Sequence, residues 1–352
     1  MTTGGRKLLA IVGALAMVGI AFPIRALIDD DGDNKGTNDR RTPVLLCAAE
    51  LANVCDELER EANVKIVLDA VGATTSTLST RTEAENGRPE YDGWLTFDRN
   101  ADIVQEARRR NSLPAILEDP SSAIARTPLL LAIWKDRANV LDAHCGGDIT
   151  VACIGGVAGT RWESIGGEAG WGDVKLGHAD PEATGEGLAV IGQEAAQFVG
   201  RSRLSRDDFE EDAFLEWFST VERAVELDAD AFAHLLSFGA ARYGVVTTTE
   251  ATATRQLARA SRDKREALRL LYPEPVASID VVFAPFIGGD SDLADIVTGR
   301  DGTTALERAG FRVGTDPPEP RPDGAPPLPD RSNLPDAGTL EALLQTWRGV
   351  TE

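Results

Sequence analysis

Apolar residues between positions 43 and 128 follow two alternating patterns. Short apolar runs at Val44–Ala48, Lys65–Val71 and Trp94–Phe97 predict three β-strands. In Leu51–Ala62 and Ala101–Arg110 the apolar residues return about every 3.6 positions, which predicts two helices. Strands that alternate with helices of this length are typical of a parallel sheet covered by helices.

The pattern changes at Arg126-Thr127-Pro128, where a strongly apolar segment begins. Further strands are predicted at Leu129–Trp134, Ile149–Ile154, Arg242–Thr247 and Ser278–Phe283. Helices are predicted at Asp207–Val225, Asp228–Ala240, Ser261–Leu271 and Thr339–Val350. The last of these has an apolar face, so it is expected to dock on the rest of the protein.

The segment Val174–Gly200 holds the strongest signal for a binding site. An apolar run at Val174–Gly177 is followed by a turn, the small-residue loop Thr184–Gly187, and a helix with helical apolar spacing. A loop that leads into a helix leaves backbone N–H groups free to bind a ligand. The alternative is a plain strand-to-helix joint, in which glycine only allows tight packing.

The N-terminus predicts the cellular compartment. Arg6 and Lys7 precede an apolar run, Leu8–Ile24, which is long enough to cross a membrane with the N-terminus in the cytoplasm. We expect residues 1–28 to be a membrane anchor or a signal, and the pattern favours an uncleaved anchor over a removed signal peptide. Residues 29–42 are polar and charged, as in a flexible linker. The globular part is therefore expected outside the cytoplasm, on a single-pass membrane protein.

Four cysteines form two pairs with the same spacing. Cys47 and Cys55 are eight positions apart, and so are Cys145 and Cys153. Outside the cytoplasm, such pairs predict two local disulfides. A zinc site is the alternative, but His144 beside Cys145 is its only support, so no metal is expected.

Composition and motifs exclude several classes of function. The 352 residues carry a formal net charge of -21, which argues against a nucleic-acid partner. The three histidines, His144, His178 and His234, show no partner arrangement, and the nucleophile, metalloprotease and phosphate-loop motifs are missing. We therefore predict a protein that is not an enzyme and has no cofactor.

The order of these segments resembles the type II extracytoplasmic solute-binding proteins of ABC transporters. It looks closest to an actinobacterial branch often fused to a von Willebrand A domain. The matching segments are Cys47–Leu51, Gly72–Leu78, Tyr91–Trp94, Arg126–Leu130, Ala179–Gly185, Gly244–Glu250 and Leu343–Arg348. The resemblance implies an α/β fold of two Rossmann-like lobes after the N-terminal transmembrane helix. Residues 43–127 and 248–352 would form lobe 1, and residues 128–247 lobe 2.

The resemblance also implies that loops after the strands converge on a cleft between the lobes. The loop Gly72–Ser76 is expected to open a helix at Thr77, and it is expected to be exposed, like the loop Thr184–Glu186. For Thr74–Ser76 the alternative is helix capping, and for Asp92 it is a turn. If Glu186 and Glu250 face the cleft, the ligand is uncharged or cationic. The predicted ligand-binding residues are Ala49, Glu50, Thr74, Thr75, Ser76, Asp92, Arg126, Thr184, Gly185, Glu186, Thr249 and Glu250.

The function implied is the clamping of a small polar solute, delivered to an ABC-type importer. The other hypothesis is a membrane-tethered sensor or scaffold that uses the same fold to bind a protein partner. The expected partners are an ABC permease in the first case and a von Willebrand A domain protein in the second. The identity of the solute is left open.

Overall fold

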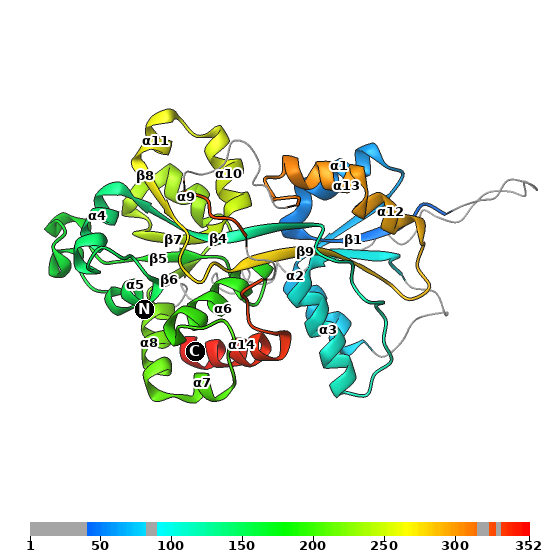
Figure 1. The fold of residues 1–352 in the computed structure, drawn as a ribbon, viewed down its shortest axis with the longest axis horizontal. Helices are drawn as coiled ribbons and strands as arrows, with labels where there is room; N and C mark the ends of the chain where they lie inside the picture. Colours follow the sequence, from blue (N-terminus) through cyan, green and yellow to red (C-terminus); the bar gives the residue numbers. More distant parts are fainter. Residues whose placement is uncertain (1–40, 82–89, 315–323, 329–331) are drawn as a thin grey trace, which may run out of the picture. The chain divides into compact units, whose positions relative to one another are not determined.

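A long strand, β4 (Ala125–Trp134), connects two parts of a mixed sheet. The computed structural model describes residues 41–81, 90–314, 324–328 and 332–352. The other strands are β1 (Val44–Ala48), β2 (Lys65–Asp69), β3 (Gly93–Phe97), β5 (Leu176–His178), β6 (Val225–Leu227), β7 (Val245–Thr249), β8 (Leu268–Leu271) and β9 (Ser278–Pro285). Their order in the sheet is β2-β1-β3-β9-β4-β7-β5-β6, and β8 also pairs with β4 (Figure 1).

The direction of the strands differs between the outer and central parts of the sheet. The pairs β1–β2, β1–β3, β5–β6 and β5–β7 are parallel, as predicted. The central strands β4 and β9 run antiparallel to each other and to their other neighbours. The predicted α/β class is confirmed, and so is the parallel arrangement of the first three strands, whereas the antiparallel pairing of β4 and β9 at the centre was not predicted.

Pro128 marks the point at which β4 changes partners. Residues Ala125–Pro128 pair with β9, whereas Leu129–Ile133 pair with β7. Proline has no N–H group to donate to a sheet, and here it ends one pairing just before the next begins.

Helices cover the sheet on both faces. Around β1 and β9 they are α1 (Ala52–Glu61), α12 (Asp292–Thr298) and α13 (Arg300–Arg308) on one side, and α2 (Val71–Thr80) and α3 (Asp98–Arg110) on the other (Figure 1). Around β4 and β7 they are α4 (Lys135–His144), α5 (Val151–Val157), α6 (Gly185–Val199), α7 (Asp207–Glu210), α8 (Asp212–Arg223), α9 (Ala231–Phe238), α10 (Glu250–Arg259), α11 (Arg262–Ala267) and α14 (Ala337–Thr351). Short 3₁₀ helices are η1 (Ala49–Leu51), η3 (Trp162–Ile165), η4 (Ala169–Trp171) and η5 (Gly239–Ala241).

Successive side chains of β4 enter different apolar clusters. Leu130 and Ala132 pack with residues of α9 and α10, whereas Leu131 and Ile133 pack with residues of α4 and α5. Side chains of a strand alternate between its faces, so burial on both faces gives the continuous apolar run seen in the sequence.

Two predicted elements have a different structure. Ile149–Ile154 was expected to be a strand, but α5 begins at Val151, and the Thr150 hydroxyl caps it by accepting the N–H of Cys153. Ser261–Leu271 was expected to be one helix, but α11 ends at Ala267 and β8 follows, paired with β4. A short apolar run does not by itself distinguish a helix from a strand, and in the second case pairing with β4 decides.

Both predicted disulfides are confirmed. Cys47 is bonded to Cys55 and Cys145 to Cys153. The first bond closes the corner between β1 and α1, which carries Glu50, and the second joins the end of α4 to α5. A closed loop of this size stabilises the fold by about 2 kcal/mol through the unfolded state.

The predicted membrane segment Leu8–Ile24 and most of the predicted linker lie outside the described residues. In the part of the chain that the structure describes, no helix combines the length and the apolar character needed to span a membrane.

Candidate functional site

Glu50 connects the end of β1 to the start of α6. Its Oε1 accepts the backbone N–H of Glu186 at 2.9 Å, and its Oε2 accepts that of Gly185 at 3.1 Å. The first N–H groups of a helix have no partner inside the helix, and they favour an anion. Two of the predicted ligand segments therefore meet. The carboxylate of Glu50 occupies the N–H groups that the sequence offered to a solute.

The surroundings of Glu50 place its ionisation near neutral pH. Burial raises the pKa of Glu50 to about 7, although the N–H groups of Glu186 and Gly185 act in the opposite direction. The nearby carboxylate of Glu186 adds to the rise. A change in charge next to this residue can therefore change whether it carries a proton.

The remaining polar groups at the start of α6 are engaged with one another. The Thr184 hydroxyl accepts the N–H of Gly187 at 2.9 Å, so it caps the helix. Glu186 accepts the Thr248 hydroxyl at 2.8 Å, and burial raises the pKa of Glu186. Thr249 caps α10 by accepting the N–H of Thr252 at 3.2 Å. Thr184 and Thr249 thus cap α6 and α10, respectively.

The segment Thr74–Ser76 is not a loop, because α2 already begins at Val71. The Thr74 hydroxyl donates to Asp69, and the Thr75 hydroxyl donates to the carbonyl of Val71 at 2.7 Å. Threonine can bond to the carbonyl four residues back, which lets it lie inside a helix. The expectation of an exposed loop is wrong for Thr74 and Thr75, which are buried, whereas Ser76 is exposed, as is Ala49.

Two glycines bring the predicted ligand segments into direct contact. The N–H of Gly72 in α2 donates to the carbonyl of Ala183 at 3.1 Å, and a methyl group on Gly72 would overlap the carbonyl oxygen of Glu182. A methyl group on Gly185 would overlap the ring of Phe97. Only glycine permits so close an approach of backbone to its neighbours. In this conformation the starts of α2 and α6 are closed against their neighbours.

Asp92 and Glu250 are both bound by groups far away in the sequence. Asp92 precedes β3 and accepts the N–H groups of Val44 at 2.7 Å and Asp290 at 3.2 Å. Glu250 is bound through both oxygens by Arg312, at 2.6 and 2.5 Å, and it also accepts the Tyr272 hydroxyl. Glu250 and Arg312 are each 0 % exposed, so Glu250 does not face a cleft in this conformation.

Sequence reasoning missed a charged group beside this junction. Asp98 and Arg99 begin α3 directly after β3, and they line a cavity of about 10 Å³ together with Gly185. Burial raises the pKa of Asp98 to about 6, against the charge of Arg99. The predicted residue Arg126 lies on β4 and pairs with Asp280 of β9 at 3.2 Å. The signal available in the sequence was the polar run that follows the apolar strand ending at Phe97.

The chain shares its fold with solved structures of binding proteins. No protein-family model matches the chain, and no curated protein matches it. A periplasmic thiamin binding protein is 10% identical, with a TM-score of 0.58 over 91% of this chain and 99% of that one. Iron-bound HitA from Pseudomonas aeruginosa is 13% identical, with a TM-score of 0.58 over 88% of this chain and 99% of that one. An extracellular solute-binding protein from Bordetella parapertussis is 14% identical, with a TM-score of 0.56 over 88% and 99%. The chain therefore has the α/β fold of periplasmic solute-binding proteins.

Proposed function

We propose that this chain is an extracytoplasmic, membrane-tethered solute-binding protein that closes two lobes on a small polar solute and serves an ABC-type importer. The observation that carries the proposal is the meeting of Glu50 with the first N–H groups of α6. These groups belong to segments far apart in the sequence, at a corner of the type where α/β folds bind ligands. The shared fold supports the same function, although fold alone does not assign one.

The division into two lobes is part of this proposal. The change of partner at Pro128 supports the predicted boundary between residues 127 and 128. The pairing of β7 and β8 with β4 favours a return to the first lobe at β9, later than the predicted return after Thr247. On this view β4 and β9 are the two connections about which the lobes move.

The charges around the junction favour a cationic or uncharged solute. Carboxylates outnumber arginines there, and an oxyanion would be repelled by them. A bound amine would instead hold Glu50 in its ionised form, because an opposite charge nearby lowers the pKa of a carboxyl group. The carboxylates are those of Glu50, Asp98, Glu186 and Asp280, and the arginines are Arg99, Arg126 and Arg255.

The proposal requires the junction to open before a solute enters. The contact of Gly72 with Ala183 and the contacts of Glu50 with α6 both have to separate. A solute favours closure only through contacts that it makes in the closed state, so it must replace some of these bonds. Glu50 is the residue best placed to exchange the N–H groups of α6 for a solute.

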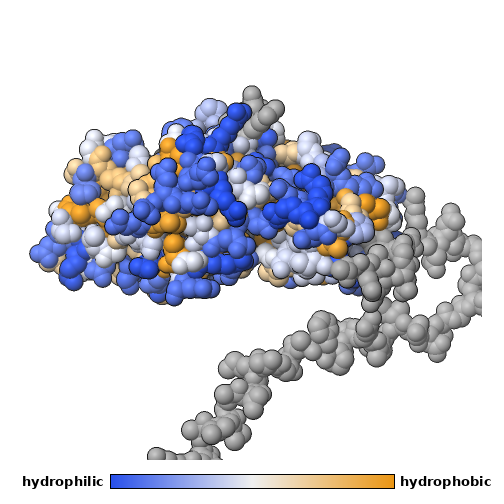
Figure 2. Space-filling view, turned by 90° about the horizontal axis from the view of Figure 1, so that it is seen from below, coloured by the Kyte–Doolittle hydropathy of each residue, from blue (hydrophilic) through white to orange (hydrophobic). Residues whose placement is uncertain are grey.

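The second candidate function is a sensor or scaffold that binds a protein partner, such as a von Willebrand A domain protein. The observation that favours it is the tight glycine packing at Gly72 and Gly185, which fills the junction. In the view of Figure 2 the surface is mostly hydrophilic, and its hydrophobic residues form separate groups. A partner on this face would therefore be recognised mainly through polar contacts.

A thermal-shift screen of the full chain in detergent tests the proposed function. The solutes are diamines and polyamines, thiamin, amino acids, sugars and inorganic phosphate. We expect an amine to raise the melting temperature by about 5 °C at a hundred times its dissociation constant, and phosphate to have no effect. Glu50→Gln should weaken the response at least about tenfold, whereas Glu59→Gln on the exposed face of α1 should not. If no solute shifts the melting temperature, the solute-binding function is rejected in favour of the scaffold.

A further inference from the structure

Three ionisable side chains meet in the interior, apart from the junction at Glu50. His178 ends β5, Glu194 lies in the middle of α6, and Glu222 lies near the end of α8. Their exposed fractions are 1%, 4% and 5%, and one ligand atom from each lies within 4.8 Å of the others. No partner of His178 is visible in the sequence, because the three residues come together only in the folded chain.

The cluster contains buried polar atoms that lack a well-aligned hydrogen bond within the described part of the chain. These atoms are His178 Nε2, Glu194 Oε2 and Glu222 Oε1, and the carboxyl groups of Glu194 and Glu222 lie close enough to interact with each other. His178 Nε2 and Glu222 Oε2 are 3.4 Å apart without forming a well-aligned hydrogen bond. Buried polar groups in native proteins are nearly always paired, and an unpaired one costs about 1–3 kcal/mol. A cation would bind His178 Nε2 and a carboxylate oxygen of Glu194 and of Glu222, which would satisfy these side chains.

Neighbouring groups hold two of these side chains in an orientation that is typical of metal ligands. His178 Nδ1 lies 2.7 Å from the carbonyl oxygen of Ala179, which can only accept, so Nδ1 carries a proton and Nε2 points to the carboxylates. Glu222 Oε2 accepts the indole N–H of Trp347 in α14 at 2.6 Å. Metal-binding histidines and carboxylates are usually oriented by bonds of this kind from outside the coordination sphere.

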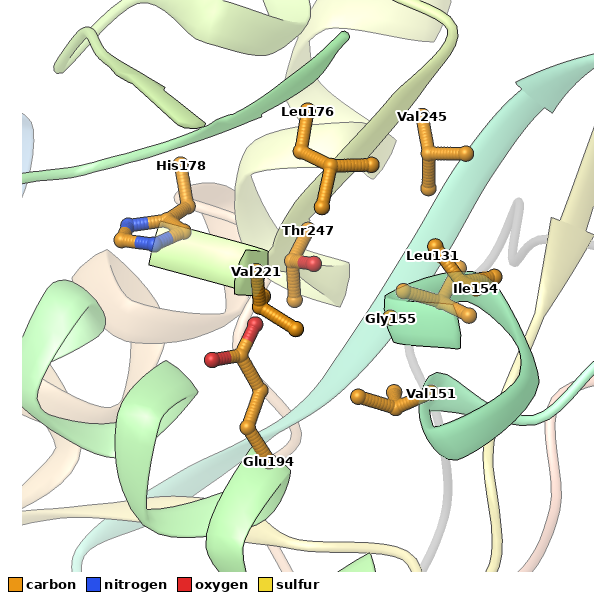
Figure 3. A pocket seen from close by; sticks show the side chains of 10 residues that line it. All are labelled: Leu131, Val151, Ile154, Gly155, Leu176, His178, Glu194, Val221, Val245 and Thr247. Atoms are coloured by element: carbon orange, nitrogen blue, oxygen red, sulfur yellow. The ribbon is translucent and has the colours of Figure 1, made fainter. Parts of the chain in front are cut away.

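A small cavity lies beside the cluster. Its volume is about 10 Å³, and His178, Glu194 and Thr247 line it together with apolar side chains. In Figure 3 His178 and Glu194 lie on one side, and Leu131, Val151 and Ile154 on the other. Such a volume holds about one water molecule. A three-ligand metal site needs room for one further ligand of this size.

We propose that His178, Glu194 and Glu222 bind one zinc ion in the interior of this protein. One imidazole and two carboxylates suit zinc, whereas calcium and magnesium prefer six or more oxygen ligands. Bonds of about 2.0–2.1 Å in a tetrahedral site place the ligand atoms about 3.3 Å apart. His178 Nε2 and Glu222 Oε2 already have about this separation, and a ligand atom of Glu194 lies within 4.8 Å of those of the other two residues. The ion ties α6 to α8 and, through Trp347, to the C-terminal helix α14.

Metal content tests the proposal directly. The full chain is expressed with zinc in the medium, purified in detergent without chelator, and analysed by elemental mass spectrometry. We expect about one zinc per chain, and removal of zinc by a chelator during mild heating should lower the melting temperature by about 5 °C. Cobalt added to the zinc-free protein should give the visible absorption of a tetrahedral site. A zinc-free protein that neither takes up cobalt nor gains stability with zinc overturns the proposal, and the cluster is then a network that shares a proton.

Variants locate the ion. Glu194→Gln and His178→Asn change each ligand with little change in size, and each should weaken zinc binding at least about a hundredfold. Trp347→Phe removes only the supporting N–H and should weaken binding about tenfold. The control is His234→Asn, because His234 also contacts a carboxylate, that of Asp228, but is half-exposed. Retention of one zinc by both ligand variants would overturn the assignment, and the wild-type measurement does not depend on whether the variants fold.

Discussion

Glu250 and Glu222 are both buried glutamates, but their surroundings differ in one respect. Glu250 has a matched cation, Arg312, on both oxygens and the Tyr272 hydroxyl in addition. Glu222 has the indole N–H of Trp347 and, at 3.4 Å, His178 Nε2 at one oxygen, whereas its other oxygen has no well-aligned hydrogen bond from the residues that the structure describes. A buried charge is stable only when other groups replace the water it has lost. Burial alone therefore does not reveal the role of a carboxylate, and the groups that face its two oxygens have to be compared.

The largest effect is expected from Arg312→Ala. The substitution leaves Glu250 charged and unpaired in the interior, which should lower the free energy of unfolding by about 3–5 kcal/mol. Arg308→Ala is the control, because Arg308 pairs with Glu57 at the exposed surface and should contribute less than about 1 kcal/mol. Urea unfolding followed by tryptophan fluorescence measures both variants. Equal losses of unfolding free energy in the two variants would show that the buried pair of Arg312 and Glu250 contributes no more than a surface pair.

A sharper test exchanges each glutamate for glutamine in the presence of a chelator. Glu250→Gln leaves the Arg312 guanidinium buried without its counter-charge, so it should cost about 3 kcal/mol. Glu194→Gln keeps the shape of a buried side chain that has an unsatisfied oxygen, so without metal it should change stability by less than about 1 kcal/mol. Adding zinc should stabilise the wild type but not the Glu194 variant. If both variants lose the same stability in the presence of the chelator, the surroundings of Glu250 and Glu194 do not differ in the way described.

The smallest effect concerns Glu50, which is half-buried and pairs with N–H groups rather than with a cation. Folding raises its pKa from 4.5 to about 7, so the folded state favours the protonated form. Its contribution to stability is present in full below about pH 4.5 and is lost as the pH rises through about 7. The stability of the wild type relative to Glu50→Gln should fall by about 1 kcal/mol over this range, since solvent screens a half-buried group. Urea unfolding at several pH values measures this difference, with Glu59→Gln as a flat control, and a rise with pH would contradict it.

The sequence predicted best what depends on neighbours along the chain. The equal spacing of the cysteine pairs and the predicted compartment were enough for both disulfides. The apolar run Ile149–Ile154 suits a strand or a helix, and the cap at Thr150 favours the helix. The α/β class could be predicted because short apolar runs alternate with segments of helical periodicity. The direction of β9 could not be predicted in this way, because it depends on which strands β9 pairs with.

Long-range contacts limited the prediction of the site. The contact of Glu50 with Gly185 and Glu186 crosses 135 residues, so periodicity along the chain carries no information on it. The prediction of a loop at Gly72–Ser76 was wrong because a run of small polar residues is compatible with a loop and with the first turn of a helix. The approach of His178, Glu194 and Glu222 depends on the packing of α6 against α8, which the sequence alone did not reveal.

The position of α14 has a consequence for how the parts of the fold open. Its residues Leu340, Leu343 and Trp347 fill the apolar cluster formed by α6 and α8, although they lie far from both helices in the sequence. When α14 detaches, apolar side chains of α6 and α8 lose their cover, so the three helices form one unit of local stability. The backbone N–H groups of α6 should therefore exchange with solvent no more slowly than the opening of α14 permits.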